Sequence, residues 1–200
     1  RGQDPSRRVF TGKAAHGAMP HLGINAFFKA IDWLVAERAK NPHLQLGCIT
    51  GGIVHNIVPE RCEVEVMDGD HPCPRISFLQ EFLRLVRDSE RFLAEQRDVR
   101  FDPPMTTGNV GVIRDGPEGI DIEFDYRLIP ATALDRLMTH WGELARHCPG
   151  GKVEVIRSNP PMNTLETSEI ARYVTQSLQA VGLPTDFLHK SGNTEGTILN

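Results

Sequence analysis

Apolar side chains recur every three or four positions along several stretches of the chain, a pattern typical of helices with one buried face. In the first stretch, Phe27 and Ile31 are four positions apart, and Asn25 just before them is a residue type that begins helices. The third stretch is followed by a Pro-Gly-Gly sequence, which stops a helix. The expected helices cover residues 21–38, 76–96, 131–147 and 168–181.

Shorter runs between these helices alternate apolar and polar residues, as half-buried strands do. Residues 62–66 show this most clearly, because a cysteine and two valines alternate with two glutamates. Turn-forming glycines and prolines separate several of the runs. The expected strands cover residues 9–15, 46–49, 62–66, 108–113, 120–128, 152–156 and 186–189.

The order of these elements predicts an α+β fold with a mainly antiparallel sheet and helices packed on one face. We expect a ferredoxin-like βαββαβ unit with an added hairpin and helix. Two prolines within residues 159–163 break both helix and strand, so a linker and a domain boundary are expected there. The chain starts without an initiator Met and stops just after a glycine-rich turn. We therefore interpret it as a piece of a longer protein, with one domain at residues 1–160 and part of a second at 161–200.

Composition and charge exclude several function classes. Hydrophobic residues make up 40% of the chain and charged residues 24%, so a packed core is expected. The formal net charge is −4 and the expected central strands carry acidic residues, which argues against an RNA-binding platform, other nucleic-acid binding and an anionic membrane partner. No apolar run approaches the roughly 18 residues of a membrane span. The four cysteines form no CxxC pair, so we expect free thiols in a cytoplasmic protein.

Three motifs carry a resemblance to a known family. Residues 12–26 contain an Ala-His pair followed by an Asn-Ala pair. Residues 51–62 begin with Gly-Gly and continue through Asn and Val-Pro to Cys, and residues 191–196 read Ser-Gly-Asn-Thr-Glu-Gly. In this order they resemble the zinc-dependent family of acetylornithine deacetylase, succinyl-diaminopimelate desuccinylase, aminoacylase and carboxypeptidases. The likeness is to the lid (dimerisation) domain and to a fragment of the α/β catalytic domain.

The resemblance implies a catalytic role for His16, which matches the lid histidine of the family. In the family, two zinc ions held by the catalytic domain activate water. The lid histidine, supplied by the partner subunit, donates a hydrogen bond to the oxyanion that forms. A homodimer through the lid domain is therefore expected, joined by an edge strand and the helix at residues 21–38.

The same resemblance implies substrate-binding residues. Asn56 matches a side-chain amide that contacts the substrate, although an ordinary turn asparagine is the alternative. Arg127 resembles a strand-terminal arginine that binds the substrate carboxylate through its guanidinium fork, and a surface ion-paired arginine is the alternative. In the third motif, backbone N–H groups can approach a ligand closely. Its expected substrate-positioning residues are Gly192, Asn193, Thr194 and Glu195.

The zinc ligands of the family are not expected within this chain. Its His-x-Asp and Glu-Glu motifs, which hold the metal and the general base, are absent from the sequence. Asp70 with His71, and His140 with His147, do not have a convincing ligand pattern. We therefore expect no metal site in the chain, and we expect the chain by itself to bind no zinc and to be inactive.

Two functions from different classes follow. The first is part of a di-zinc amidohydrolase that hydrolyses an N-acyl amino acid or a peptide-like amide, with the lid supplying substrate and oxyanion contacts. The alternative is a non-catalytic ferredoxin-like module for dimerisation or small-molecule binding. The motifs favour the first.

Overall fold

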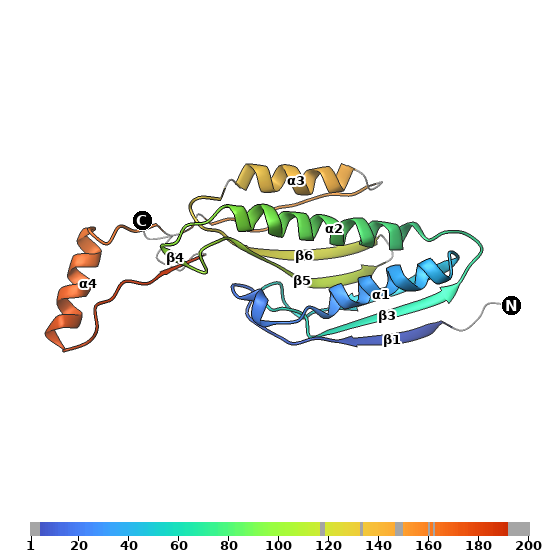
Figure 1. Ribbon diagram of the computed structural model, residues 1–200, viewed down its shortest axis with the longest axis horizontal. Coiled ribbons are helices and arrows are strands. Elements are labelled where there is room, and N and C mark those ends of the chain that lie inside the picture. The colour runs from blue at the N-terminus through green and yellow to red at the C-terminus, as the bar shows by residue number, and fades with distance from the viewer. Residues whose placement is uncertain are drawn as a thin grey trace.

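The computed structural model describes residues 5–116, 119–132, 134–146, 150–159, 161 and 163–191 (Figure 1). Strands and helices alternate along most of this length. Their order is β1 (Ser6–Thr11), the 3₁₀ helix η1 (Pro20–Leu22), α1 (Ala26–Lys40), β2 (Leu44–Gly51), β3 (Arg61–Asp68), α2 (Pro74–Glu95), β4 (Phe101–Asp102), β5 (Thr107–Gly116), β6 (Gly119–Arg127), α3 (Leu134–Arg146), α4 (Glu169–Ala180) and β7 (His189–Lys190).

Five of the strands form one sheet in the order β1-β3-β2-β5-β6, and every neighbouring pair is antiparallel. The register between β2 and β5 is confined to Gly51 and Ile113, whereas β5 and β6 pair along almost their whole length. Helices α1, α2 and α3 lie along one face of the sheet (Figure 1). The predicted α+β class is therefore confirmed. The finer ferredoxin-like description stays a prediction. In the observed sheet β5 lies beside β2, and β1 is at the edge.

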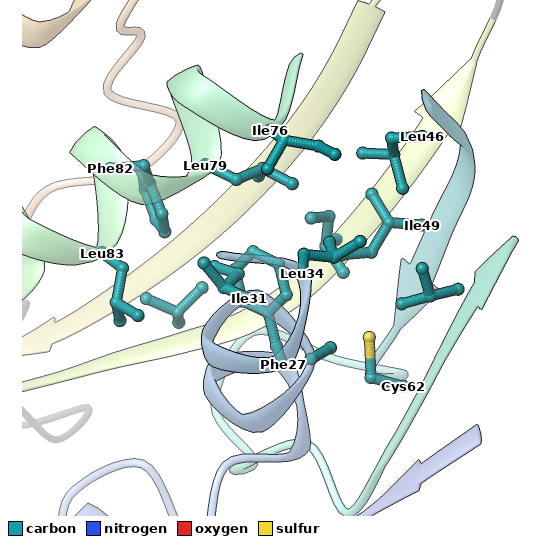
Figure 2. Packing of buried hydrophobic residues seen from close by; sticks show 14 of the residues in the cluster. Phe27, Ile31, Leu34, Leu46, Ile49, Cys62, Ile76, Leu79, Phe82 and Leu83 are labelled. Atoms are coloured by element: carbon teal, nitrogen blue, oxygen red, sulfur yellow. The ribbon is translucent and has the colours of Figure 1, made fainter. Parts of the chain in front are cut away.

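The core lies between α1, α2 and the sheet (Figure 2). Helix α1 begins at Asn25, whose side chain accepts a hydrogen bond from the backbone N–H of Phe27 at 3.0 Å. The apolar residues at helical spacing form the buried face of α1, which packs against α2 and the sheet, and Phe27, Ile31 and Leu34 are completely buried. Helix α2 contributes Ile76, Leu79, Phe82 and Leu83, and the strands contribute Leu46, Ile49 and Cys62.

Aromatic rings extend this core toward α3. Phe82 lies within 5.9 Å of Phe27, 5.5 Å of Phe124 and 6.0 Å of Trp141 between ring centroids, so it joins α1, α2, β6 and α3. The indole N–H of Trp141 donates to the hydroxyl of Tyr126 at 2.9 Å, which satisfies a polar atom in a mostly apolar layer. Helix α3 is therefore fixed to the second hairpin as well as to α2.

Several expected elements need correction. The segment 152–156 forms no strand: it is irregular and exposed, with Ile156 at 88% exposure. Its alternating sequence suits a strand, but in the described structure no neighbouring strand pairs with it. The expected strand at 9–15 ends at Thr11, and the expected helix at 21–38 is divided, because Gly23 is extended between η1 and α1.

The short strands β4 and β7 pair in parallel and bring Phe101 against His189. The sequence pattern missed β4 and placed the last strand at 186–189, where the structure has only His189–Lys190. Helix α4 matches the expected helix at 168–181 and extends away from the sheet (Figure 1). Within the described residues, the apolar core cluster draws only on residues 26–141. The domain boundary at residue 160 remains a proposal.

Candidate functional site

The first two motifs meet in the structure. His16 and Ile57 form an antiparallel bridge between two loops. The backbone N–H of Gly17 donates to the carbonyl of Asn56 at 2.7 Å, and the N–H of Val58 donates to the carbonyl of Ala15 at 2.9 Å. We call residues 12–25 the histidine loop and residues 52–60 the asparagine loop. These backbone hydrogen bonds hold His16 and Asn56 close together, so both residues can belong to one site.

The imidazole of His16 is exposed and has a defined orientation. Its Nδ1 accepts a hydrogen bond from the backbone N–H of Ala18 at 3.1 Å. A ring nitrogen that accepts has no proton, so the neutral ring carries its proton on Nε2. The backbone turn is closed by a further bond from the N–H of Met19 to the carbonyl of His16 at 2.8 Å. His16 can therefore present Nε2–H as a hydrogen-bond donor at the molecular surface.

Arg127 lies at the same end of the molecule as the histidine loop. It ends β6 and pairs across the ladder with Thr107, whose hydroxyl donates to the carbonyl of Ala18 at 3.2 Å. The Nε of Arg127 donates to Asp125 at 2.9 Å, and both side chains are mostly buried, at 21% and 15% exposure. The guanidinium is thus held to its own strand by a carboxylate. A role in binding a substrate carboxylate stays a proposal.

The expected positioning turn, Gly192 to Glu195, lies outside the described residues. Shortly before it, a cavity of about 250 Å³ opens between β4, β7 and the segment preceding α4. Its wall includes His189, whose Nε2 lies 3.0 Å from the carboxylate of Glu166. The lining residues are Arg100, Asn163, Thr164, Leu165, Glu166, Thr167 and His189. None of them belongs to the histidine or asparagine loop.

The described residues do not fit a zinc site. Among them no group of three or more His, Cys, Asp or Glu side chains converges as metal ligands would. The ring of His140 is 3.0 Å from the carbonyl of Leu85, and His147 is outside the described part.

Two polar residues on β5 were missed by the sequence reasoning. Thr107 and Asn109 are 9% and 4% exposed, respectively, and Asn109 donates to the carbonyl of His55 at 2.7 Å. Both therefore contact the loops that carry the candidate residues. A signal was available, because asparagine is disfavoured in a strand unless its amide has a specific partner.

Part of the chain matches a known protein family. Residues 6–67 match the family model of the peptidase dimerisation domain. The solved structure of aminoacylhistidine dipeptidase from Vibrio alginolyticus is similar at a TM-score of 0.63 and 16% identity, over 95% of this chain and 47% of that one. At this identity the likeness shows the fold alone, and the chain spans about half the length of that dipeptidase.

Two further structures match with low superposition scores. A tripeptidase from Staphylococcus aureus is 14% identical over 98% of this chain and 40% of that one, at a TM-score of 0.24. Aminopeptidase PepT from Bacillus cereus is 15% identical over 94% and 37%, also at 0.24. A TM-score of 0.24 supports no statement about how the elements of this chain are arranged.

A search of curated proteins found no match. In the described residues no helix is long and apolar enough to cross a membrane. The lid-domain resemblance predicted from the first two motifs is thus confirmed: residues 6–67, which hold both motifs, match the peptidase dimerisation domain.

Proposed function

We propose that this chain is the lid and dimerisation part of a metal-dependent hydrolase that cleaves C–N amide bonds in a peptide or an N-acyl amino acid. The observation that carries the proposal is the meeting of the His16 and Asn56 loops inside a segment that matches a peptidase dimerisation domain. In this proposal residues 1–160 are the lid and residues 161–200 begin the catalytic domain. The free thiols of Cys48, Cys62 and Cys73 suit a reducing compartment, so we place the protein in the cytoplasm.

His16 is the proposed catalytic residue of the lid. Hydrolysis of an amide creates a negative charge on the carbonyl oxygen, which needs donors already aimed at it. The bond from Ala18 to Nδ1 supports such a role, because it leaves the proton on Nε2 and orients the ring before substrate arrives. The His16 side chain is exposed on the loop, so it can enter a site formed by another part of the protein.

Asn56 and Arg127 are the proposed substrate contacts. Asn56 is half-buried and its backbone carbonyl is bonded to the residue after His16, so we assign its side-chain amide to the polar backbone of a substrate. Arg127 offers a guanidinium fork for a carboxylate, with Asp125 fixing the Nε side of that fork. The turn formed by Gly192, Asn193, Thr194 and Glu195 completes the proposal as a backbone donor on the catalytic side. The two zinc ions that the resemblance implies would be held by other parts of the protein.

A homodimer is the proposed assembly. Strand β1 is at the edge of the sheet and pairs with β3 on one side. Its Arg8 lies 4.8 Å from the ring of Trp33 on α1, so strand and helix present one continuous surface. An edge strand with unpaired backbone groups is completed by a second copy of itself in many symmetric dimers. Sedimentation of the chain tests this proposal, and a strict monomer up to high micromolar concentration contradicts it.

The test of the catalytic proposal is His16→Ala in the whole protein. Turnover of an N-acyl amino acid or dipeptide should fall on the order of 100-fold, because one oxyanion donor is lost, while bound zinc stays the same. His21→Ala is the matched control, since His21 is also exposed in the same loop, and its turnover should be unchanged. An equal fall in both variants, or none in His16→Ala, would favour the non-catalytic dimerisation or small-molecule-binding module instead.

A further inference from the structure

Strand β5 presents two polar side chains on one face, beneath both loops of the candidate site. Thr107 and Asn109 are two positions apart, so their side chains leave the strand on the same side. The neighbouring Val110 is in the apolar core, which places Thr107 and Asn109 on the face away from the helices. Both are buried, although neither belongs to the core cluster. Their burial therefore needs specific partners.

Each of the two side chains binds one loop. The hydroxyl of Thr107 donates to the carbonyl of Ala18 at 3.2 Å, two residues after His16. The amide of Asn109 donates to the carbonyl of His55 at 2.7 Å, directly before Asn56. One short stretch of one strand thus fixes the backbone beside both candidate site residues.

The asparagine loop lies directly on the β5 backbone. A Cβ atom on Gly111 would lie 2.2 Å from the carbonyl oxygen of His55, which no side chain can tolerate. Gly52, at φ 77°, would in turn place a Cβ 1.9 Å from the carbonyl oxygen of Gly111. Loop and strand therefore approach as bare backbones, and the Asn109 hydrogen bond lies within this close contact.

The histidine loop has a second attachment to the same strand. The side-chain amide of Asn25 donates to the carbonyl of Val110 at 3.0 Å, while its oxygen caps α1. The loop is thus held to β5 both near its middle, at Ala18, and at its end. Because both loops are bonded to β5, a movement of this strand would shift His16 and Asn56 together.

We propose that Thr107 and Asn109 are positioning residues that set the relative placement of His16 and Asn56. Neither touches the substrate in this proposal. Their effect on catalysis rests on the proposed function, whereas their effect on the loops does not. The β5 hairpin lies outside the segment that matches the dimerisation family, so the site depends on a strand that the matched segment lacks.

Amide hydrogen exchange on the whole chain tests the effect on the loops. In Thr107→Val and Asn109→Leu, which remove the donors but keep similar volumes, exchange at Gly17 and Val58 should rise about 10-fold or more. Exchange at Val64, inside the β1–β3–β2 ladder, should stay within twofold, which also shows that the variant is folded. Thr107→Ser keeps the hydroxyl and should restore the protection of Gly17.

Imidazole ¹⁵N NMR gives a second readout on the same variants. In the original chain Nδ1 of His16 should be unprotonated at high pH, and Thr107→Val should produce a mixture of both tautomers as the Ala18 N–H moves away. Unchanged exchange at Gly17 and Val58 would overturn the proposal. So would a rise of equal size at Val64, since that describes general destabilisation.

Kinetics of the whole protein separate this proposal from the proposed function. Thr107→Val should lower kcat about 10-fold with KM within about twofold, because His16 is misplaced and not removed, and Thr107→Ser should recover most of kcat. Asn109→Leu should lower kcat by a similar factor and also raise KM, because it displaces the proposed substrate contact Asn56. A large loss in His16→Ala with normal kcat in both β5 variants overturns the positioning role alone. If His16→Ala retains full turnover while loop exchange rises in the β5 variants, the proposed function fails and the structural role of β5 stands.

Discussion

Phe82→Ala should be among the most destabilising single substitutions in the chain. Phe82 is 1% exposed and its ring lies against Phe27, Phe124 and Trp141 from three other elements. Removing such a ring loses its transfer free energy and leaves a cavity that three elements would have to close, at a cost of about 3–5 kcal/mol. Since a domain is stable by only about 5–15 kcal/mol, the variant should stay folded with a much reduced reserve.

Urea unfolding followed by tryptophan fluorescence measures this cost, because Trp141 is in contact with the substituted position. With a urea m-value of about 2–3 kcal/mol/M, the midpoint should fall by about 1–2.5 M at unchanged slope. Phe187→Ala is the matched control, since Phe187 is 47% exposed, and it should change the free energy of unfolding by less than about 0.5 kcal/mol. A loss below about 1.5 kcal/mol for Phe82→Ala, or an equal loss in the control, would refute the packing argument.

Three further predictions test other parts of the structure. Asp115→Ala should cost about 1–3 kcal/mol in urea unfolding, because the 7%-exposed carboxylate pairs with Arg75 and accepts a hydrogen bond from the backbone N–H of Ile49. Glu81→Ala, which removes the exposed ion pair between Arg84 and Glu81 on α2, should cost under about 1 kcal/mol. Asn25→Ala should cost about 1–2 kcal/mol, since it removes the α1 cap and leaves the Val110 carbonyl without its donor; a loss below about 0.3 kcal/mol contradicts this. Because burial raises the pKa of Cys62 from 9.0 to about 12, the folded state keeps the proton that the unfolded state releases, so the contribution of Cys62 to the free energy of unfolding should be constant below pH 9 and fall as pH rises toward 12. Native Cys62 should accordingly resist alkylation at pH 8, and Cys62→Ala should remove this part of the pH dependence; the same slope in both proteins would contradict its origin.

The periodicity of apolar residues predicted the helices well, because burial of one face decides where they pack. Phe27 and Ile31 lie four positions apart and both are completely buried, and Asn25 caps α1 as its residue type suggested. The same reasoning failed for residues 152–156, because an alternating pattern forms a strand only where a neighbouring strand completes the ladder. The two-residue strand β4 is too short to give any periodic signal.

The candidate site was only partly predictable, because it is assembled by backbone contacts. The motifs identified His16 and Asn56, yet the bonds that bring them together join main-chain atoms and leave no mark in the side-chain sequence. The tautomer of His16 follows from its bond to the N–H of Ala18, which only coordinates reveal. An asparagine within a strand indicates that Asn109 has a specific partner, but the sequence does not show that this partner is the loop beside Asn56.

The narrow pairing of β2 with β5 has a consequence for how the molecule holds its shape. Because these strands meet through Gly51 and Ile113 alone, the sheet has a seam between its first three strands and the second hairpin. Across that seam, alignment depends on α1 and α2 packing above it and on the Arg75–Asp115 ion pair beside it. The register of β1, β3 and β2 is therefore fixed by hydrogen bonds among those three strands, whereas the second hairpin is held in place mainly by the shared core and by side-chain bonds to the two loops.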